Sequence, residues 1–319
     1  MRMTAGKYHD AGPAGRPAGP GPAGSGPAPL TRDQAFQALR ANLEVTGLRE
    51  AAVSARCQLL REQLSAQLAV DAAFVTGSCR RHTLIAPLDA AVIDVLAVLR
   101  RRHRSRSSLG VIERVAEVLA AASPAGAVRR TGRAVTVTGG EFAVDVLPAF
   151  ARPWWSSHGG WEIGDPAGLS WLGTNPDEHV RLSASADRAH GGQLVPRIRQ
   201  LKAWNRQAGE PLRSFHLEVL AWSVFGTSAW RHERVRSDWA SARRFFAEAR
   251  DKLSSPLYDP AGSGSAVGGY LDEGAASRAA AAMTAAHDLC LTAETAVRDD
   301  DLRAMHQAYG RIFGPCYPG

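Results

Sequence analysis

The sequence TGSCRRHT at residues 76–83 leads into the apolar run VIDVLAVL at 92–99, and these two stretches decide the fold class. The Gly-Ser turn ends a short apolar strand over 73–76, and the run at 92–99 is apolar on both faces except at Asp94. Such a run is typical of a fully buried strand. The stretch EFAVDVLP at 141–148 repeats the pattern around Asp145. The sequence therefore predicts two buried strands that each carry one carboxylate.

A carboxylate in a buried strand needs a partner, because leaving its charge unpaired costs several kcal/mol. For one such aspartate, pairing with an arginine is the more frequent explanation. For Asp94 and Asp145 together, downstream of a Gly-Ser turn, we favour metal binding, since Mg²⁺ prefers oxygen ligands. Gly77 lets the backbone approach a phosphate closely, and Ser78 adds a hydroxyl donor. Two acids on adjacent strands beside such a turn indicate a nucleotidyltransferase palm, which holds two metal ions over a triphosphate.

Composition supports an intracellular globular protein with anionic partners. The 319 residues are 45% hydrophobic, and the net charge of +7 favours nucleotides or nucleic acid, although an arginine-rich surface alone also explains it. The four cysteines are scattered without the spacing of a zinc site, which fits a reducing compartment. We find no apolar run long enough to span a bilayer and no signal-peptide pattern. We therefore expect a cytoplasmic protein with no membrane partner.

The chain order predicts an α+β protein with two structured parts. Residues 1–29 are rich in Gly, Pro and Ala and are expected to form a disordered leader. Residues 30–155 are expected to hold a long N-terminal spine helix, or two helices in line, and a mixed-sheet palm. The spine begins at a capping box, TRDQ at 31–34, and Gly47 interrupts its pattern. Residues 156–319 are expected to form an α-helical domain.

Three further features bear on phosphate binding. Lys202 lies at the edge of an amphipathic helix and offers a point charge to a triphosphate, or is a solvated lysine. Ser214 is a candidate phosphate contact and also a candidate N-cap of the next helix. The basic run Arg100–Arg106 either binds nucleic acid through phosphate contacts or forms a solvated loop.

The chain resembles the cGAS/DncV-like nucleotidyltransferases (CD-NTases), the bacterial oligonucleotide cyclases of anti-phage CBASS systems. Each motif is weak alone, but their order and spacing from about Phe74 to Leu291 are fairly specific. The motifs are TGSCRRHTLIAPL at 76–88, AVIDVLAVL at 91–99, FAVDVLPAF at 142–150, TNPDEH at 174–179, LKAWN at 201–205, SFHLEVL at 214–220 and YDP at 258–260.

The resemblance implies a polymerase-β-like palm followed by a C-terminal α-helical domain. It implies Mg²⁺ or Mn²⁺ as cofactor, ATP or GTP as substrates, and a cyclic di- or trinucleotide product that activates a separate effector. Matched residue by residue, Asp94 and Asp145 would be catalytic metal ligands. Gly77 and Ser78 would hold the donor phosphates, and Lys202 and Ser214 would touch the triphosphate.

One position departs from the family pattern. Val92 stands where the first metal-binding aspartate of an Asp-x-Asp motif is expected, and a valine cannot bind Mg²⁺. Either Asp89 or Glu141 compensates, or activity is low, or the chain is a catalytically impaired nucleotide-binding regulator. An RNA-tailing nucleotidyltransferase is a third alternative, and it would require an added primer.

Overall fold

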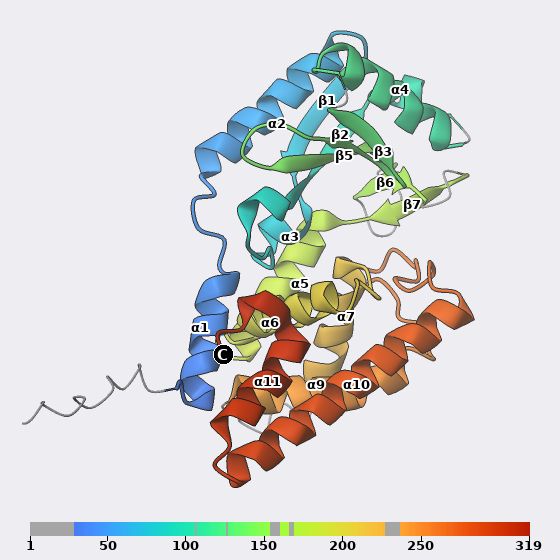
Figure 1. The fold of residues 1–319 in the computed structure, drawn as a ribbon. Coiled ribbons are helices and arrows are strands. Elements are labelled where there is room, and N and C mark those ends of the chain that lie inside the picture. Colours follow the sequence, from blue (N-terminus) through green and yellow to red (C-terminus); the bar gives the residue numbers. More distant parts are fainter. Residues whose placement is uncertain (1–28, 106, 126, 154–159, 166–168, 227–236) are drawn as a thin grey trace, which may run out of the picture.

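The computed structural model describes residues 29–105, 107–125, 127–153, 160–165, 169–226 and 237–319. It shows a palm built on a sheet at the top of Figure 1 and a helical half at the bottom. The predicted α+β class, a palm followed by a helical half, is confirmed. The expected leader at 1–29 lies almost wholly outside the described residues.

Seven strands form one mixed sheet in the part of the chain that the structure describes. They are paired in the order β1-β2-β5-β4-β3, with β6 joining β5 to β7. β2 and β5 are parallel, and every other pair is antiparallel. A hairpin turn at Gly132-Arg133 joins β3 to β4. The strands are β1 (Val70–Val75), β2 (Val92–Leu99), β3 (Val128–Thr131), β4 (Ala134–Val137), β5 (Ala143–Ala151), β6 (Trp161–Gly164) and β7 (Trp171–Thr174).

Strand alternation gives the two faces of the sheet different roles. In β2, Ile93, Val95, Ala97 and Leu99 pack into one buried cluster with residues of two helices, α2 (Glu50–Ser65) and α4 (Leu109–Ala121). Successive side chains of a strand point to opposite faces. The even-numbered residues therefore lie on the other face, where Leu96 and Val98 join Leu147 and Ala149 of β5 in a smaller cluster. Asp94 and Asp145 share that face.

The helical half is packed around α6. Its buried cluster contains side chains of α6 and of the helices around α6. The elements of this half are α1 (Arg32–Leu43), α5 (Pro176–Ala189), α6 (Leu194–Gln207), α7 (Ser214–Phe225), α9 (Asp238–Lys252), α10 (Glu273–Arg298), α11 (Leu302–Phe313) and η3 (Gly314–Cys316). The palm adds the short turns of helix α3 (Gly77–Arg80), η1 (Leu88–Ala90) and η2 (Arg101–His103).

Two expectations about domain organisation can be compared with the structure. Of the two alternatives for the N-terminal stretch, two helices are present instead of one long spine helix, and Gly47 lies between them at φ +81°. The capping box of α1 is present, yet α1 packs against the helical half while α2 packs against the palm (Figure 1). The palm also does not end at residue 155, because β6 and β7 extend its sheet to Thr174.

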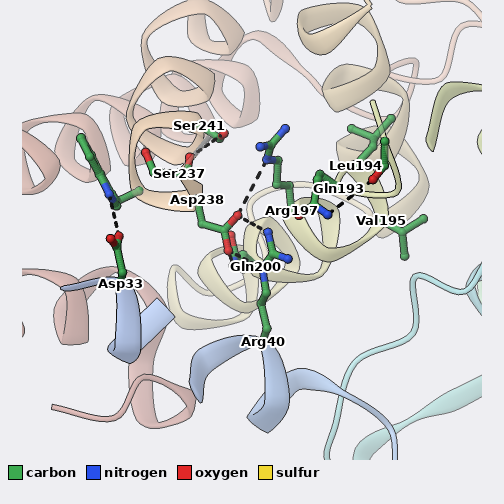
Figure 2. A network of polar contacts seen from close by, with 12 residues as sticks. Asp33, Arg40, Gln193, Leu194, Val195, Arg197, Gln200, Ser237, Asp238 and Ser241 are labelled. Atoms are coloured by element: carbon green, nitrogen blue, oxygen red, sulfur yellow. Dashed lines mark hydrogen bonds and ion pairs between the residues drawn. The ribbon is translucent and has the colours of Figure 1, made fainter. Parts of the chain in front are cut away.

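A buried polar network fastens α1 to the helical half. Figure 2 shows Arg40 of α1 reaching Asp238 of α9, beside Gln200 and Arg197 of α6. Both Asp238 oxygens accept hydrogen bonds from Arg40, and Gln200 Nε2 donates to Asp238 Oδ2 at 2.7 Å. Asp238 has a side chain only 7% exposed, so its charge depends on these partners. We name these residues the Asp238 network.

We expect Asp238→Asn to lower the free energy of unfolding by about 3 kcal/mol, because it leaves Arg40 and Arg197 without their carboxylate. Urea denaturation would measure the loss. Glu117→Gln, which breaks an exposed pair with Arg114 on α4, is the matched control and should cost less than about 1 kcal/mol. Equal losses in the two variants would contradict the structural role given to the network.

Candidate nucleotide-binding site

The parallel register of β2 and β5 brings the two predicted acids together. Asp94 and Asp145 are direct register partners, and both are partly buried. Thr136 of β4 lies opposite Asp145, and its hydroxyl donates to Asp145 Oδ1 at 2.6 Å. That hydrogen bond orients the Asp145 carboxylate, while the Asp94 carboxylate lies beside the Gly-Ser turn. The prediction that the two acids occupy adjacent strands is confirmed.

The Gly-Ser turn lies directly against Asp94. The backbone N–H of Thr76 donates to the Asp94 carbonyl at 2.8 Å, and Gly77 follows at φ +66°. A Cβ on Gly77 would lie 1.8 Å from Asp94 Oδ2, so only glycine fits here. Gly77 and Ser78 open α3, which has only four residues. The predicted phosphate-binding turn and one predicted metal ligand are therefore in contact.

Val92 lies on the same face of β2 as Asp94 and is 38% exposed. Because this valine is exposed, it does not serve as a core residue, and the position supplies no carboxylate beside Asp94. Glu141 pairs with Arg49 at 2.6 Å, and Asp89 is exposed in η1. Across the described ranges, no cluster of three His, Cys, Asp or Glu side chains is arranged to hold a metal ion. Neither proposed substitute joins the pair.

Charge at the acid pair is only partly balanced by the protein. Burial, and then the charge of Asp145, raise the pKa of Asp94 to about 6, although Arg81, Arg133 and Lys202 act in the opposite direction. Two carboxylates that repel each other in this way favour a bound cation. The donor set therefore fits one hard divalent ion, Mg²⁺ or Mn²⁺, shared by Asp94 and Asp145. It lacks the third carboxylate expected for the complete two-ion set.

Lys202 is not the solvated lysine that the alternative interpretation required. Its side chain is 6% exposed and lies 2.7 Å from Glu218 Oε1, and its Nζ donates to Thr83 Oγ1 at 3.1 Å. Burial lowers the pKa of Lys202, and Glu218 opposes this shift. Lys202 is also close enough to Asp94 for each to influence the pKa of the other. It therefore reaches the site while held in an ion pair.

Ser214 is the first residue of α7 and is exposed. The N-cap position belongs to Arg213, whose side chain makes no capping hydrogen bond, so the N-cap interpretation of Ser214 is wrong. The Arg213 guanidinium lies 4.2 Å from the centre of the Tyr270 ring. An exposed hydroxyl and a cation at the N-terminus of a twelve-residue helix suit an anionic group.

Sequence reasoning missed three residues around this site. Arg133, in the β3–β4 hairpin, has its pKa lowered by burial and by the nearby charge of Arg213, against the attraction of Asp94. Arg81 and Glu218 appeared only as letters within longer motifs. No periodicity or spacing marks a hairpin arginine as facing an acid two strands away, so tertiary structure alone identifies Arg133.

The basic run Arg100–Arg106 is largely engaged with the palm. Arg100 pairs with Asp71 at 2.9 Å, and Arg104 pairs with Glu162 at 2.7 Å. Arg101 donates to the Ala151 carbonyl at 2.9 Å, and Arg106 lies outside the described residues. These pairs reduce the charge available to a nucleic acid, so nucleic-acid binding here stays a prediction.

Comparison with known proteins supports a nucleotidyltransferase fold for this chain. Residues 30–186 match the model of the Second Messenger Oligonucleotide or Dinucleotide Synthetase domain, known as SMODS. This match and the fold shared with solved CD-NTases confirm the resemblance to cGAS/DncV-like CD-NTases. No curated protein sequence matches significantly.

Solved structures of CD-NTases share the fold over almost the whole chain. CdnC of E. coli MS115-1, solved with ATP, has a TM-score of 0.71 at 16% identity, covering 90% of this chain and 99% of CdnC. CdnG of Bradyrhizobium diazoefficiens, solved with GTP, has a TM-score of 0.66 at 14% identity, covering 88% and 94%. DncV of Vibrio cholerae has a TM-score of 0.57 at 12% identity, covering 90% and 86%. CdnC has also been solved in a complex with a HORMA protein.

None of the described helices is both long enough and apolar enough to cross a membrane.

We expect Gly77→Ala to weaken ATP binding by about tenfold or more, because the added Cβ must displace the Asp94 carboxylate. Isothermal titration calorimetry would measure the affinity. Gly47→Ala is the matched control, since Gly47 also has a positive φ of +81° but no atom within 4 Å of the point where a Cβ would lie. Gly47→Ala should cost about 1 kcal/mol of stability and leave ATP affinity unchanged. Equal ATP affinities in the two variants would contradict the assigned contact.

The raised pKa of Asp94 makes stability depend on pH when no divalent cation is bound. Between about pH 4 and pH 6 the folded protein keeps a proton on Asp94 that the unfolded chain, with a pKa near 3.8, has released. Folding stability should therefore fall as pH rises through this range and level off above it. Urea denaturation of the wild type and Asp94→Asn in EDTA would isolate the effect. The wild type should lose stability relative to Asp94→Asn with rising pH, and a constant difference would refute the assignment.

Proposed function

We propose that this protein is a cytoplasmic CD-NTase that binds nucleoside triphosphates between its palm and helical half and joins them into a cyclic oligonucleotide, in anti-phage defence. The observation that carries this proposal is the in-register pair Asp94 and Asp145 against the Gly77 turn. Solved structures of similar proteins support the proposal, because CdnC was solved with ATP and CdnG with GTP.

The chain's own residues would bind and orient the triphosphate. Gly77 allows close approach of the phosphates, and Ser78 supplies a hydroxyl donor. The N-terminus of α7, with Ser214, adds backbone N–H groups and a positive dipole end. Asp94 and Asp145 would hold Mg²⁺ or Mn²⁺, which would lower the pKa of the attacking hydroxyl and balance charge on the leaving pyrophosphate.

Val92 lowers the rate of nucleotidyl transfer that we expect from this site. With one of three acidic positions occupied by an exposed valine, the cation is held by fewer ligands, and transfer should be slow. The same valine favours a second candidate function, a catalytically impaired nucleotide-binding regulator. Cyclic product, an effector that responds to it, and a HORMA-like regulatory partner of the kind bound to CdnC all belong to the proposal. RNA tailing is distinguished by its need for a primer.

We expect Val92→Asp to raise nucleotide incorporation by about tenfold or more, because it restores the missing carboxylate beside Asp94. Labelled ATP, GTP, CTP and UTP would be incubated with Mg²⁺ or Mn²⁺, with and without an RNA primer, and phosphatase-resistant products resolved. Val92→Ala is the matched control, since it removes the valine without adding a ligand, and it should behave as the wild type. Asp145→Asn should abolish product.

The outcomes separate the candidate functions. Product that appears only with a primer indicates RNA tailing. Product from Val92→Asp alone, with ATP binding intact in the wild type, indicates the regulator. Absence of nucleoside triphosphate binding in the wild type by calorimetry contradicts all three candidate functions.

A further inference from the structure

Glu218 of α7 is the most completely buried charge near the site, with no exposed side-chain area. Its Oε2 accepts from Arg81 Nε at 2.7 Å. Its Oε1 accepts from Arg81 Nη2 at 3.1 Å and from the Thr83 hydroxyl at 2.8 Å, and lies 2.7 Å from Lys202 Nζ. Burial would raise the pKa of Glu218, but Lys202 and Arg81 outweigh it and hold the pKa at about 2. The carboxylate is therefore ionised at neutral pH. We name these four residues the Glu218 cluster.

Glu218 has no acceptor capacity left for a ligand. A carboxylate offers about four lone-pair positions, and the cluster uses four donors. Lys202 is different, because an ammonium group has three N–H donors and Glu218 and Thr83 account for two. The third N–H is available on a residue whose charge is felt at Asp94. Glu218 thus orients the Lys202 ammonium group and keeps no acceptor position of its own for a ligand.

The same carboxylate also fixes the Gly-Ser turn. Thr83 uses its hydroxyl to reach Glu218, and its backbone N–H donates to the Ser78 carbonyl at 2.9 Å. Arg81, two residues before it, donates its backbone N–H to the Gly77 carbonyl at 3.2 Å. These two hydrogen bonds connect the Glu218 cluster to Gly77 and Ser78, the two predicted phosphate-binding residues.

Stability alone is a weak explanation for this arrangement. Replacing a buried ion pair by packed apolar side chains is often neutral or stabilising, so a fold needs no carboxylate here. The Asp238 network is a comparable buried cluster that also involves α6, but it joins only helices of the helical half. Gln200 and Lys202 are two positions apart on α6 and therefore face different directions.

We propose that Glu218 is a positioning residue of the nucleotide site, which aims the third N–H of Lys202 at the triphosphate. This proposal rests on the proposed function only in requiring that the site binds a nucleoside triphosphate. It predicts that Glu218 acts on binding through Lys202.

The test is a double-mutant cycle on binding, with Glu218→Gln, Lys202→Met and the double variant. Glu218→Gln keeps the shape of the side chain and removes its charge. Affinities for ATP and for inorganic triphosphate would be measured by calorimetry, and melting temperatures in parallel. Asp238→Asn is the matched control, because it weakens a buried ion cluster that does not contact the turn. Wild-type binding is measured first, and its absence would refute the proposed function before any variant is compared.

We expect Glu218→Gln and Lys202→Met each to lower the affinity for both ligands by about tenfold. The double variant should bind no more weakly than Lys202→Met. Asp238→Asn should lower the melting temperature and leave both affinities unchanged. Unchanged affinity in Glu218→Gln, or additive losses in the double variant, would overturn the proposal. If Glu218→Gln does not fold, the double variant, which carries no unpaired lysine, is compared with Lys202→Met. Equal affinities then support the proposal, and a further loss overturns it.

Discussion

The parallel pairing of β2 with β5 is the constraint on which the site depends. A parallel ladder with Asp94 opposite Asp145 forces both carboxylates onto one face, because side chains alternate with a period of two. A shift of one residue in either strand would send one acid into the apolar cluster beneath α2 and α4. The branched and aliphatic residues of that cluster hold the register, since burying them is possible in one alignment only.

Around this pair the protein supplies positive charge from both halves. Arg133 comes from a hairpin of the palm, Lys202 from α6 and Arg213 from the start of α7. Arg133 and Lys202 offset only part of the effect of burial and of the Asp145 charge, which together raise the pKa of Asp94. The two aspartates, these cations and the exposed Val92 are the basis for proposing that the site binds a triphosphate with one divalent ion. The site is less suited to the full two-ion arrangement.

Polar contacts join the two halves at the site, and Ile85, which follows the Gly-Ser turn, packs into the apolar cluster of the helical half. Glu218 binds Arg81 and Thr83 of the palm, and Arg199 and Arg206 of α6 donate to the carbonyls of His82 and Ala86. Such contacts are directional, so they define how the Gly-Ser turn faces α6 and α7. The segment after the Gly-Ser turn is therefore a place where the palm contacts α6 and α7 directly.

Local patterns in the sequence determined the two acid-bearing strands, the glycine turn and the class of fold, because each is a matter of periodicity, capping or a backbone that needs glycine. The absence of an aspartate at position 92 was also visible in the sequence, since it concerns a single position within one strand. Tertiary structure alone decided that α1 belongs to the helical half, that β6 and β7 extend the palm, and that Lys202 is paired with Glu218. It also brought Arg133 to Asp94. These are long-range contacts, such as the one between Arg81 and Glu218 across 137 positions of sequence, and no local pattern encodes which distant charges will meet when a chain folds.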